Sequence, residues 1–238
     1  MQDGERDDRR VVEILSLAGH ELAQPLATAL ACARLLSYSE PHLSEARRSE
    51  VCTTLLRNLW QLQSLVEDLE VTGSADLLGE VNRERLAARR EPLDMRRVLE
   101  HAIEDFCIAH PDCRLELSCD DAFPVKVDPP RFQQVLSNLL SNAHKFGSPG
   151  RCIRLEGHRE GTNVVVSLHN EGPGFSAEED RRIFEKSVRL EELVTGHGWG
   201  LYVAKAIVEA HDGDLWAESG RGHGATFFIR MPALDDAA

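Results

Sequence analysis

The sequence predicts an all-α helical hairpin that forms a dimeric four-helix bundle, followed by an α+β sandwich domain with a mixed sheet. Residues 9–71 carry apolar side chains at spacings of three and four, as amphipathic helices do. Beyond residue 92, helical patterns alternate with short strand patterns and glycine-rich turns. The 238 residues suffice for about two domains. We therefore expect a hairpin domain over 1–72, a linker over 73–92 and a second domain over 93–238.

The hairpin is expected from two helices, over 9–37 and about 43–71. The first repeats its apolar residues at Leu15, Ala18, Leu22, Leu26, Ala29, Ala33 and Leu36. The second repeats them at Cys52, Leu55, Leu59, Leu62, Val66 and Leu69. A lone hairpin buries only one side of each helix, so the leftover apolar surface favours two hairpins in an antiparallel four-helix bundle. A homodimer is therefore predicted.

The second domain is expected to place helices on one face of a mixed sheet. Helices are predicted over about 95–109, 129–146 and 199–211. Strands are predicted near 113–119, 124–127, 152–159, 163–170, 213–218 and 224–231. The strand pairs within 152–170 and 213–231 have short connections, which favours antiparallel hairpins.

Charge and composition exclude several classes of partner. The net charge of −13 disfavours a nucleic acid partner and direct contact with anionic membranes. No apolar run approaches the roughly 18 residues that span a bilayer. The six cysteines lack metal-ligand spacing, so we expect free structural thiols in a cytoplasmic protein; a redox-sensitive site and a metal site remain alternatives.

His20 is the most informative residue of the first helix. It lies two residues from Ala18 and from Leu22, about 200° around a helix from each, and should therefore face solvent. Glu21 follows at once, and a carboxylate beside an exposed imidazole can hold one ring nitrogen while the other acts as nucleophile. Pro25 removes a backbone donor and weakens the helix next to His20.

Three later stretches predict a nucleotide pocket. In RFQQVLSNLLSNAHKF, the residues Asn138, Asn142 and Lys145 share one helix face and suit Mg²⁺ and phosphate, although a solvated polar face would look similar. In NEGPGF, Asn170 can read the adenine edge while Gly172 and Gly174 allow close backbone approach; hairpin turns also use such glycines. A third stretch, GHGWGL, supplies Gly196, Gly198 and Gly200 before a helix whose N-terminus would face phosphates.

Taken together, these stretches resemble the catalytic core of bacterial sensor histidine kinases, over about residues 9–233. HELAQPL looks like the phosphoacceptor box, NLLSNAHKF like the asparagine box and NEGPGF like the first glycine box. IFEKSVR resembles the phenylalanine box, GHGWGLYVAKAIVEAHDG the second glycine box and GATFFIRMP the closing strand. The resemblance implies a dimerization and histidine-phosphotransfer hairpin followed by an ATP-binding domain of the gyrase, Hsp90, histidine kinase and MutL type.

The resemblance also implies residue roles and partners. His20 would accept the phosphoryl group and Glu21 would hold its ring. Asn142 would bind Mg²⁺, with Asn138 and Lys145 beside the phosphates of ATP. Adenine would be read by Asn170 and supported by Thr226, and Arg189 would reach the γ-phosphate. Gly196, Gly198 and Gly200 would form the phosphate-facing end of the lid, and Leu201 would also bind the nucleotide. Gln24, where related kinases often carry Thr or Asn, would aim water at the phospho-aspartate of a response regulator, although a merely solvent-facing side chain is an equal alternative.

The sequence departs from the family pattern in three places. Asn170 stands where an Asp is usual, the second aromatic of the phenylalanine box is missing, and six residues separate Arg189 from Gly196, so the lid is short. Trp199 stands where a leucine is usual.

The leading hypothesis is an ATP-dependent protein-histidine kinase that phosphorylates His20 and passes the group to a response regulator receiver domain. The signal would arrive through the first helix, from an upstream sensor module or a separate signal protein. A non-catalytic dimeric docking or phosphotransfer module with a degenerate ATP domain is the alternative. An ATPase or serine kinase of the same superfamily is a third reading, and it would leave HELAQPL idle.

Overall fold

The chain divides into two compact units, one formed mostly by residues 1–81 and the other by residues 82–107 and 111–238. The computed structural model describes residues 19, 22–37, 44–78, 86–87, 89–119, 123–180, 182–185 and 200–234. The expected positions of His20, Glu21, Arg189, Gly196 and Gly198 lie outside the described residues.

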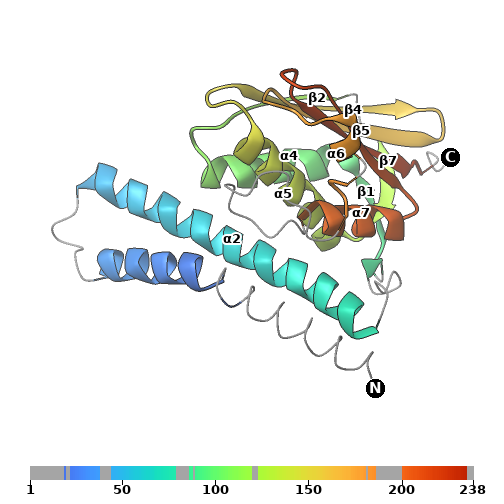
Figure 1. Cartoon of the computed structure of the whole chain (residues 1–238). Helices are drawn as coiled ribbons and strands as arrows, with labels where there is room; N and C mark the ends of the chain where they lie inside the picture. The colour runs from blue at the N-terminus through green and yellow to red at the C-terminus, as the bar shows by residue number, and fades with distance from the viewer. Residues whose placement is uncertain are drawn as a thin grey trace. The chain divides into compact units, whose positions relative to one another are not determined.

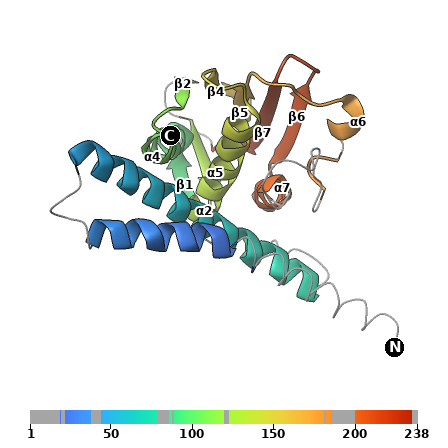
Figure 2. The ribbon, with the colours of Figure 1, turned by 60° about the vertical axis from the view of Figure 1, so that its left-hand side comes forward.

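The first unit contains a helix over residues 22–37 and α2 (Glu45–Leu78), which run side by side as a hairpin (Figures 1 and 2). Ser44 begins α2, because its hydroxyl accepts a hydrogen bond from Arg47 N at 3.3 Å. The helix continues to Leu78 and not to residue 71 as expected. The residues after 71 are mostly helix-compatible, and the single Gly73 among them does not stop the helix.

The hairpin leaves a large share of its apolar side chains uncovered. Ala29, Cys32 and Val51 are buried. Leu26 and Leu30 are instead 49% and 51% exposed, and Leu59 is 46% exposed. The expectation had Leu26 and Leu59 on the inner seam. Within one chain they lie on uncovered apolar faces, which a single hairpin cannot bury.

The second unit is built on a five-stranded sheet in the order β2-β4-β5-β7-β6. Its strands are β2 (Arg114–Cys119), β4 (Cys152–Glu160), β5 (Asn163–Asn170), β6 (Asp214–Ser219) and β7 (Ala225–Pro232). β2 pairs with β4 in parallel, whereas β4 with β5, β5 with β7, and β6 with β7 are antiparallel. The expected mixed sheet and both antiparallel hairpins are therefore confirmed.

A second, two-stranded sheet joins β1 (Glu91–Asp94) to β3 (Pro124–Val127). The sequence predicted β3 but not β1, whose first two residues fall in the expected linker. Four residues that include Pro92 carry too little strand signal, and the pairing depends on a partner about thirty residues away.

Helices cover one face of the five-stranded sheet (Figures 1 and 2). They are α4 (Met95–Ala109), α5 (Pro129–Phe146) and α7 (Gly200–Ala210), with a short α6 (Ala177–Asp180) that the sequence did not predict. Along β5, Val164, Val166 and Leu168 are buried, and Phe227 and Ile229 of β7 are buried beside them. This alternation gives each strand one face toward the helices.

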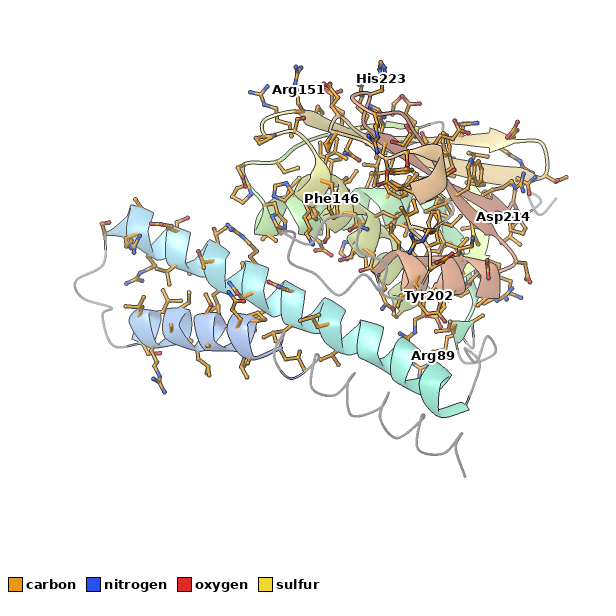
Figure 3. All side chains as sticks on the ribbon, in the orientation of Figure 1. Arg89, Phe146, Arg151, Tyr202, Asp214 and His223 are labelled. Carbon is orange, nitrogen blue, oxygen red and sulfur yellow. The ribbon has the colours of Figure 1, made fainter. Side chains whose placement is uncertain are left out.

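Helix α5 begins and ends where its sequence dictates. Asp128 caps it by accepting a hydrogen bond from Arg131 N, and two prolines occupy its first positions. At its end, a Cβ on Gly147 would lie 2.4 Å from Ala143 O, so only glycine fits there. In Figure 3, Phe146 marks this end of α5 and Tyr202 marks the first turn of α7.

Candidate nucleotide-binding site

Asn138 joins the two helices on which the expected phosphate residues lie. It is buried on α5, and its Nδ2 donates a hydrogen bond to Gly200 O, at the start of α7, over 3.0 Å. A Cβ on Gly200 would lie 3.3 Å from Asn138 Cγ, so the glycine permits this close approach. Asn138 therefore sets the position of the first residue of α7.

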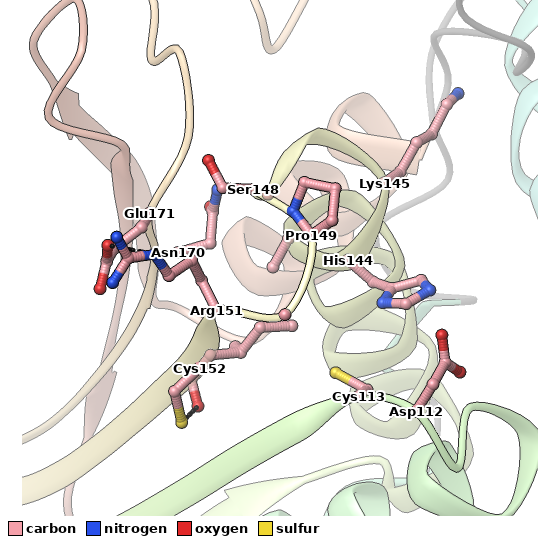
Figure 4. A pocket seen from close by; sticks show the side chains of 14 residues that line it. Asp112, Cys113, His144, Lys145, Ser148, Pro149, Arg151, Cys152, Asn170 and Glu171 are labelled. Atoms are coloured by element: carbon pink, nitrogen blue, oxygen red, sulfur yellow. Dashed lines mark hydrogen bonds and ion pairs between the residues drawn. The ribbon is translucent and has the colours of Figure 1, made fainter.

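Asn142 and Lys145 follow on α5. Asn142 is half-buried, and its side chain makes no hydrogen bond to any other described residue. Its amide oxygen is a hard ligand of the kind that Mg²⁺ prefers. The ammonium of Lys145 is exposed and lies 5.1 Å from the centre of the Phe146 ring. Figure 4 shows this side chain directed away from His144.

The turn after β5 requires glycines because neighbouring backbone atoms pack closely against it. A Cβ on Gly172 would lie 2.5 Å from Phe146 O, at the end of α5. Gly174 has a φ of +65°, and its Cβ would lie 2.4 Å from Gly220 O. Ser148 N donates to Glu171 O at 2.7 Å, and Gly224 N donates to Gly172 O at 3.1 Å. These glycines therefore hold the turn between α5 and the β6–β7 connection.

Asn170 ends β5 on the face that the helices cover. It is 4% exposed and lies opposite Ile153 of β4 and Ala225 of β7. Its Nδ2 lies 3.4 Å from the place where a Cβ on Gly172 would be. A buried amide at this point offers both a donor and an acceptor to a flat heterocycle.

Thr226 does not lie with Asn170. It pairs across the strands with His169, and its Oγ1 lies 2.9 Å from His169 Nδ1. Because side chains alternate along a strand, Thr226 and His169 share the sheet face opposite to that of Asn170. This arrangement argues against a contact between Thr226 and the base. Ala225, which sequence reasoning missed, stands on the Asn170 face instead.

The described part of the phenylalanine box packs against β7. Phe184 meets Phe227 edge to face, with ring centres 6.5 Å apart, and the ammonium of Lys205 lies 5.0 Å from the centre of the Phe184 ring. Leu201 is half-buried in the first turn of α7. In the first unit, Gln24 is exposed on its helix.

A cavity of about 280 Å³ lies against the last turn of α5 (Figure 4). Lys145 and Asn170 line it, but Asn138, Asn142 and Gly200 do not. It also contains Cys113 and Cys152. Burial, reinforced by Cys107 and Asp112, raises the pKa of Cys113 to about 11, and burial and Glu116 raise that of Cys152. Both thiols are therefore neutral near pH 7, which disfavours redox or metal chemistry at them.

Glu171 lies beside Asn170 without adding an unbalanced charge to the site. Arg151 Nε lies 3.4 Å from Glu171 Oε2, and Arg154 lies 3.9 Å from the other carboxylate oxygen. Among the described residues, no group of three or more His, Cys, Asp or Glu could hold a metal ion. No described helix is long and apolar enough to cross a membrane.

Comparisons with known proteins agree with this arrangement. Residues 127–235 match the family of histidine kinase-, DNA gyrase B-, and HSP90-like ATPases. The adaptive-response sensory kinase SasA of Synechococcus sp. (strain JA-2-3B'a(2-13)) is 32% identical over 228 residues, which cover 92% of this chain and 58% of the relative. The chain thus spans less than two thirds of the length of that relative.

Two solved structures resemble the whole chain. ShkA, solved at full length in complex with AMPPNP, has a TM-score of 0.60 and 26% identity, over 95% of this chain and 46% of that one. The Acinetobacter baumannii histidine kinase AdeS has a TM-score of 0.59 and 22% identity, over 91% of this chain and 98% of that one. The latter likeness supports the fold alone.

The second unit is therefore an ATP-binding domain of the histidine kinase, gyrase and HSP90 type. With the helical hairpin before it, this domain forms a catalytic core of the sensor histidine kinase type.

Proposed function

We propose that the chain is an ATP-dependent protein-histidine kinase of a two-component system, which phosphorylates His20 and passes the phosphoryl group to an aspartate of a response regulator. One observation carries this proposal: Asn138 fixes the start of α7 through Gly200 O, while Asn142, one helical turn further on, keeps its side-chain amide available. If α7 no longer served nucleotide binding, the close contact between Asn138 and Gly200 would not be needed. The likeness to SasA and to the AMPPNP complex of ShkA supports nucleotide use.

The reaction requires one phosphoryl group to change partners. A ring nitrogen of His20 forms a bond to the γ-phosphorus, the bond from that phosphorus to the bridging oxygen breaks, and ADP leaves with the electron pair. Glu21 would hold the imidazole and take up the proton that its ring loses. The domain supplies mostly positioning and charge neutralisation, as phosphoryl transfer demands. A second transfer, to a receiver aspartate, regenerates neutral His20.

Residues of α5 and β5 would hold the nucleotide. The buried amide of Asn170 would hydrogen-bond to the adenine edge, and the backbone at the start of α7 would face the phosphates. Mg²⁺ would take one ligand from Asn142 and the rest from water and phosphate oxygens, because that ion usually keeps few protein ligands. When bound, Mg²⁺ would neutralise phosphate charge. Lys145 would add a positive charge nearby.

The hairpin would assemble as a homodimer. Leu26, Leu30 and Leu59 are each about half exposed in a single chain. Leaving such side chains in water costs free energy, which a second hairpin recovers by covering them in a four-helix bundle. The same hairpin would present Gln24 and His20 to the receiver domain. The six thiols, all free, fit a cytoplasmic location.

The experiment that tests this function is uptake of label from γ-labelled ATP with Mg²⁺. We expect label that is lost in acid and kept in base, which is the behaviour of a phosphoramidate. Asn142→Ala should lose most of the label, since the metal-bearing phosphates lose a ligand. Asn163→Ala, at the far end of β5 from Asn170, is the matched control and should label normally. Acid-stable label would favour a serine kinase, and nucleotide binding without label would favour the docking module.

A further inference from the structure

A buried histidine joins the C-terminal end of α7 to the N-terminal end of α5. His211 is 1% exposed. Its Nε2 accepts a hydrogen bond from Asp128 N over 2.9 Å, and its Nδ1 lies 2.8 Å from Ile207 O. Nδ1 must therefore carry the proton and Nε2 the lone pair. Only the neutral imidazole satisfies both contacts.

Two further residues complete the same junction. The buried carboxylate of Asp128 accepts hydrogen bonds from Arg131 N at 3.4 Å and from Arg89 N at 3.2 Å. The Arg90 guanidinium donates to Asp212 Oδ2 at 2.5 Å and also to Ala210 O. The junction thus ties together the segment that enters the domain before β1, the start of α5 and the end of α7.

The opposite end of this helix pair carries the nucleotide residues. Helices α5 and α7 pack against each other. Asn138 holds Gly200 at one end of α7, and Asp128 holds His211 at the other. A helix transmits a displacement along its axis, and these two points are separated by about 16 Å of helix at 1.5 Å per residue. Loss of the hydrogen bonds of His211 at one end of α7 therefore shifts Gly200 at the other end.

We propose that neutral His211, together with Asp128 and Arg90, is a positioning junction that sets α7 on α5 and so places Gly200 for nucleotide binding. The proposal rests on the proposed function in that it assigns the nucleotide to this helix pair. His211 touches no substrate and acts through α7.

The junction should be sensitive to protonation. Burial lowers the pKa of His211; the hydrogen bond to Ile207 O and the charges of Asp128 and Asp212 oppose this shift, while Arg90 adds to it. The unfolded chain therefore takes up a proton at a higher pH than the folded chain does. Protonation turns Nε2 into a donor that faces the Asp128 N–H. The contribution of the junction to the free energy of unfolding is therefore fully present above about pH 6.5, the ordinary pKa of a histidine in an unfolded chain, and falls as the pH drops below that value.

The test compares His211→Phe, which keeps a ring but loses both hydrogen bonds, with His211→Gln, whose Oε1 can accept from Asp128 N without titrating. Titration calorimetry with Mg-ADP on the full chain measures affinity. We expect His211→Phe to weaken binding by at least about threefold, and His211→Gln to stay within about twofold of wild type. Between about pH 5.5 and 8, chemical denaturation without nucleotide should show that the free energy of unfolding falls more toward acid in wild type than in His211→Gln.

A second substitution covers the case in which His211→Phe does not fold. Arg90→Met should weaken Mg-ADP binding by about two- to threefold, whereas Arg230→Met, which breaks the exposed ion pair with Asp214, should leave it unchanged. Unchanged affinity in folded His211→Phe or in Arg90→Met overturns the proposal, as do identical pH profiles of the free energy of unfolding in wild type and His211→Gln. Wild type that binds Mg-ADP but takes up no label from ATP defeats the kinase function alone; wild type that binds no nucleotide defeats both.

Discussion

At the scale of single residues, the site depends on amides rather than acids. Asn138 Nδ2 donates a hydrogen bond to Gly200 O, and Asn170 is buried at the end of β5. An amide can accept from the adenine amino group, as a carboxylate does, but it brings no charge to strengthen that bond. At the proposed adenine position, the neutral amide of Asn170 would therefore bind the base less strongly than a carboxylate would.

Restoring a carboxylate at Asn170 tests this view. Asn170→Asp should tighten Mg-ADP binding by about three- to tenfold, because a charge-assisted hydrogen bond replaces a neutral one, while Asn170→Ala should weaken it by at least about fivefold. Titration calorimetry with Mg-ADP and Mg-GDP measures both affinity and base preference. Equal affinities in all three proteins would show that this side chain does not meet the base.

Gln24 is exposed and lies four residues after His20 in the sequence. If its amide aims water at a receiver phospho-aspartate, Gln24→Ala should slow dephosphorylation of a phosphorylated regulator by about tenfold or more, with autophosphorylation intact. The measurement is decay of labelled regulator in the presence of ADP. Thr28→Ala, one turn further along the same helix, is the control. An unchanged decay rate in Gln24→Ala ends the idea.

At the scale of elements, the turn after β5 locks the end of α5 to the β6–β7 connection. Gly172→Ala should destabilise the second unit by about 1–3 kcal/mol, because the added Cβ would meet Phe146 O at 2.5 Å. Thermal unfolding followed by circular dichroism measures this loss. Gly220→Ala provides the comparison, because Gly220, like Gly172, has no positive φ, and a Cβ there would come no closer than 3.5 Å, to His223 Cδ2. Equal losses in the two variants would mean that the contact with Phe146 O does not explain the glycine at position 172.

Sequence patterns predicted those elements whose signals are local. The predicted bounds of α5, 129–146, match the structure, since Asp128 and the two prolines mark its start. Strand β1 was missed because the four residues EPLD carry no strand pattern of their own and form a strand only by pairing with β3. Thr226 was expected beside the adenine base. The pairing of β5 with β7 sets Ala225, and not Thr226, opposite Asn170, and this register cannot be predicted from the sequence of one strand. His211, followed by Asp212 and Gly213, looked like an ordinary helix end, and its partner Asp128 lies 83 residues away.

At the scale of the whole molecule, the hairpin and the ATP-binding unit differ in how far a single chain buries their apolar side chains. The sandwich buries its own core under α4, α5 and α7. The hairpin leaves apolar side chains in water, and its stability should therefore depend on a second copy.

Charged residues on that apolar face should break the assembly. Leu30→Glu combined with Leu59→Glu should convert a dimer into a monomer, because each buried carboxylate would cost several kcal/mol in the bundle. Sedimentation equilibrium of the full chain measures the mass. Arg34→Glu, an exposed charge reversal on the same helix, controls for charge alone. A double variant that remains dimeric would place the interface elsewhere.

The most direct measurement is the chemical location of the phosphoryl group after incubation with Mg-ATP, by mass spectrometry of peptides prepared at neutral to basic pH. The proposed kinase function predicts phosphohistidine at His20 in wild type and no phosphorylated peptide in His20→Gln, with Mg-ADP binding unchanged in that variant. Phosphate on another residue, or undiminished phosphorylation of His20→Gln, would contradict it.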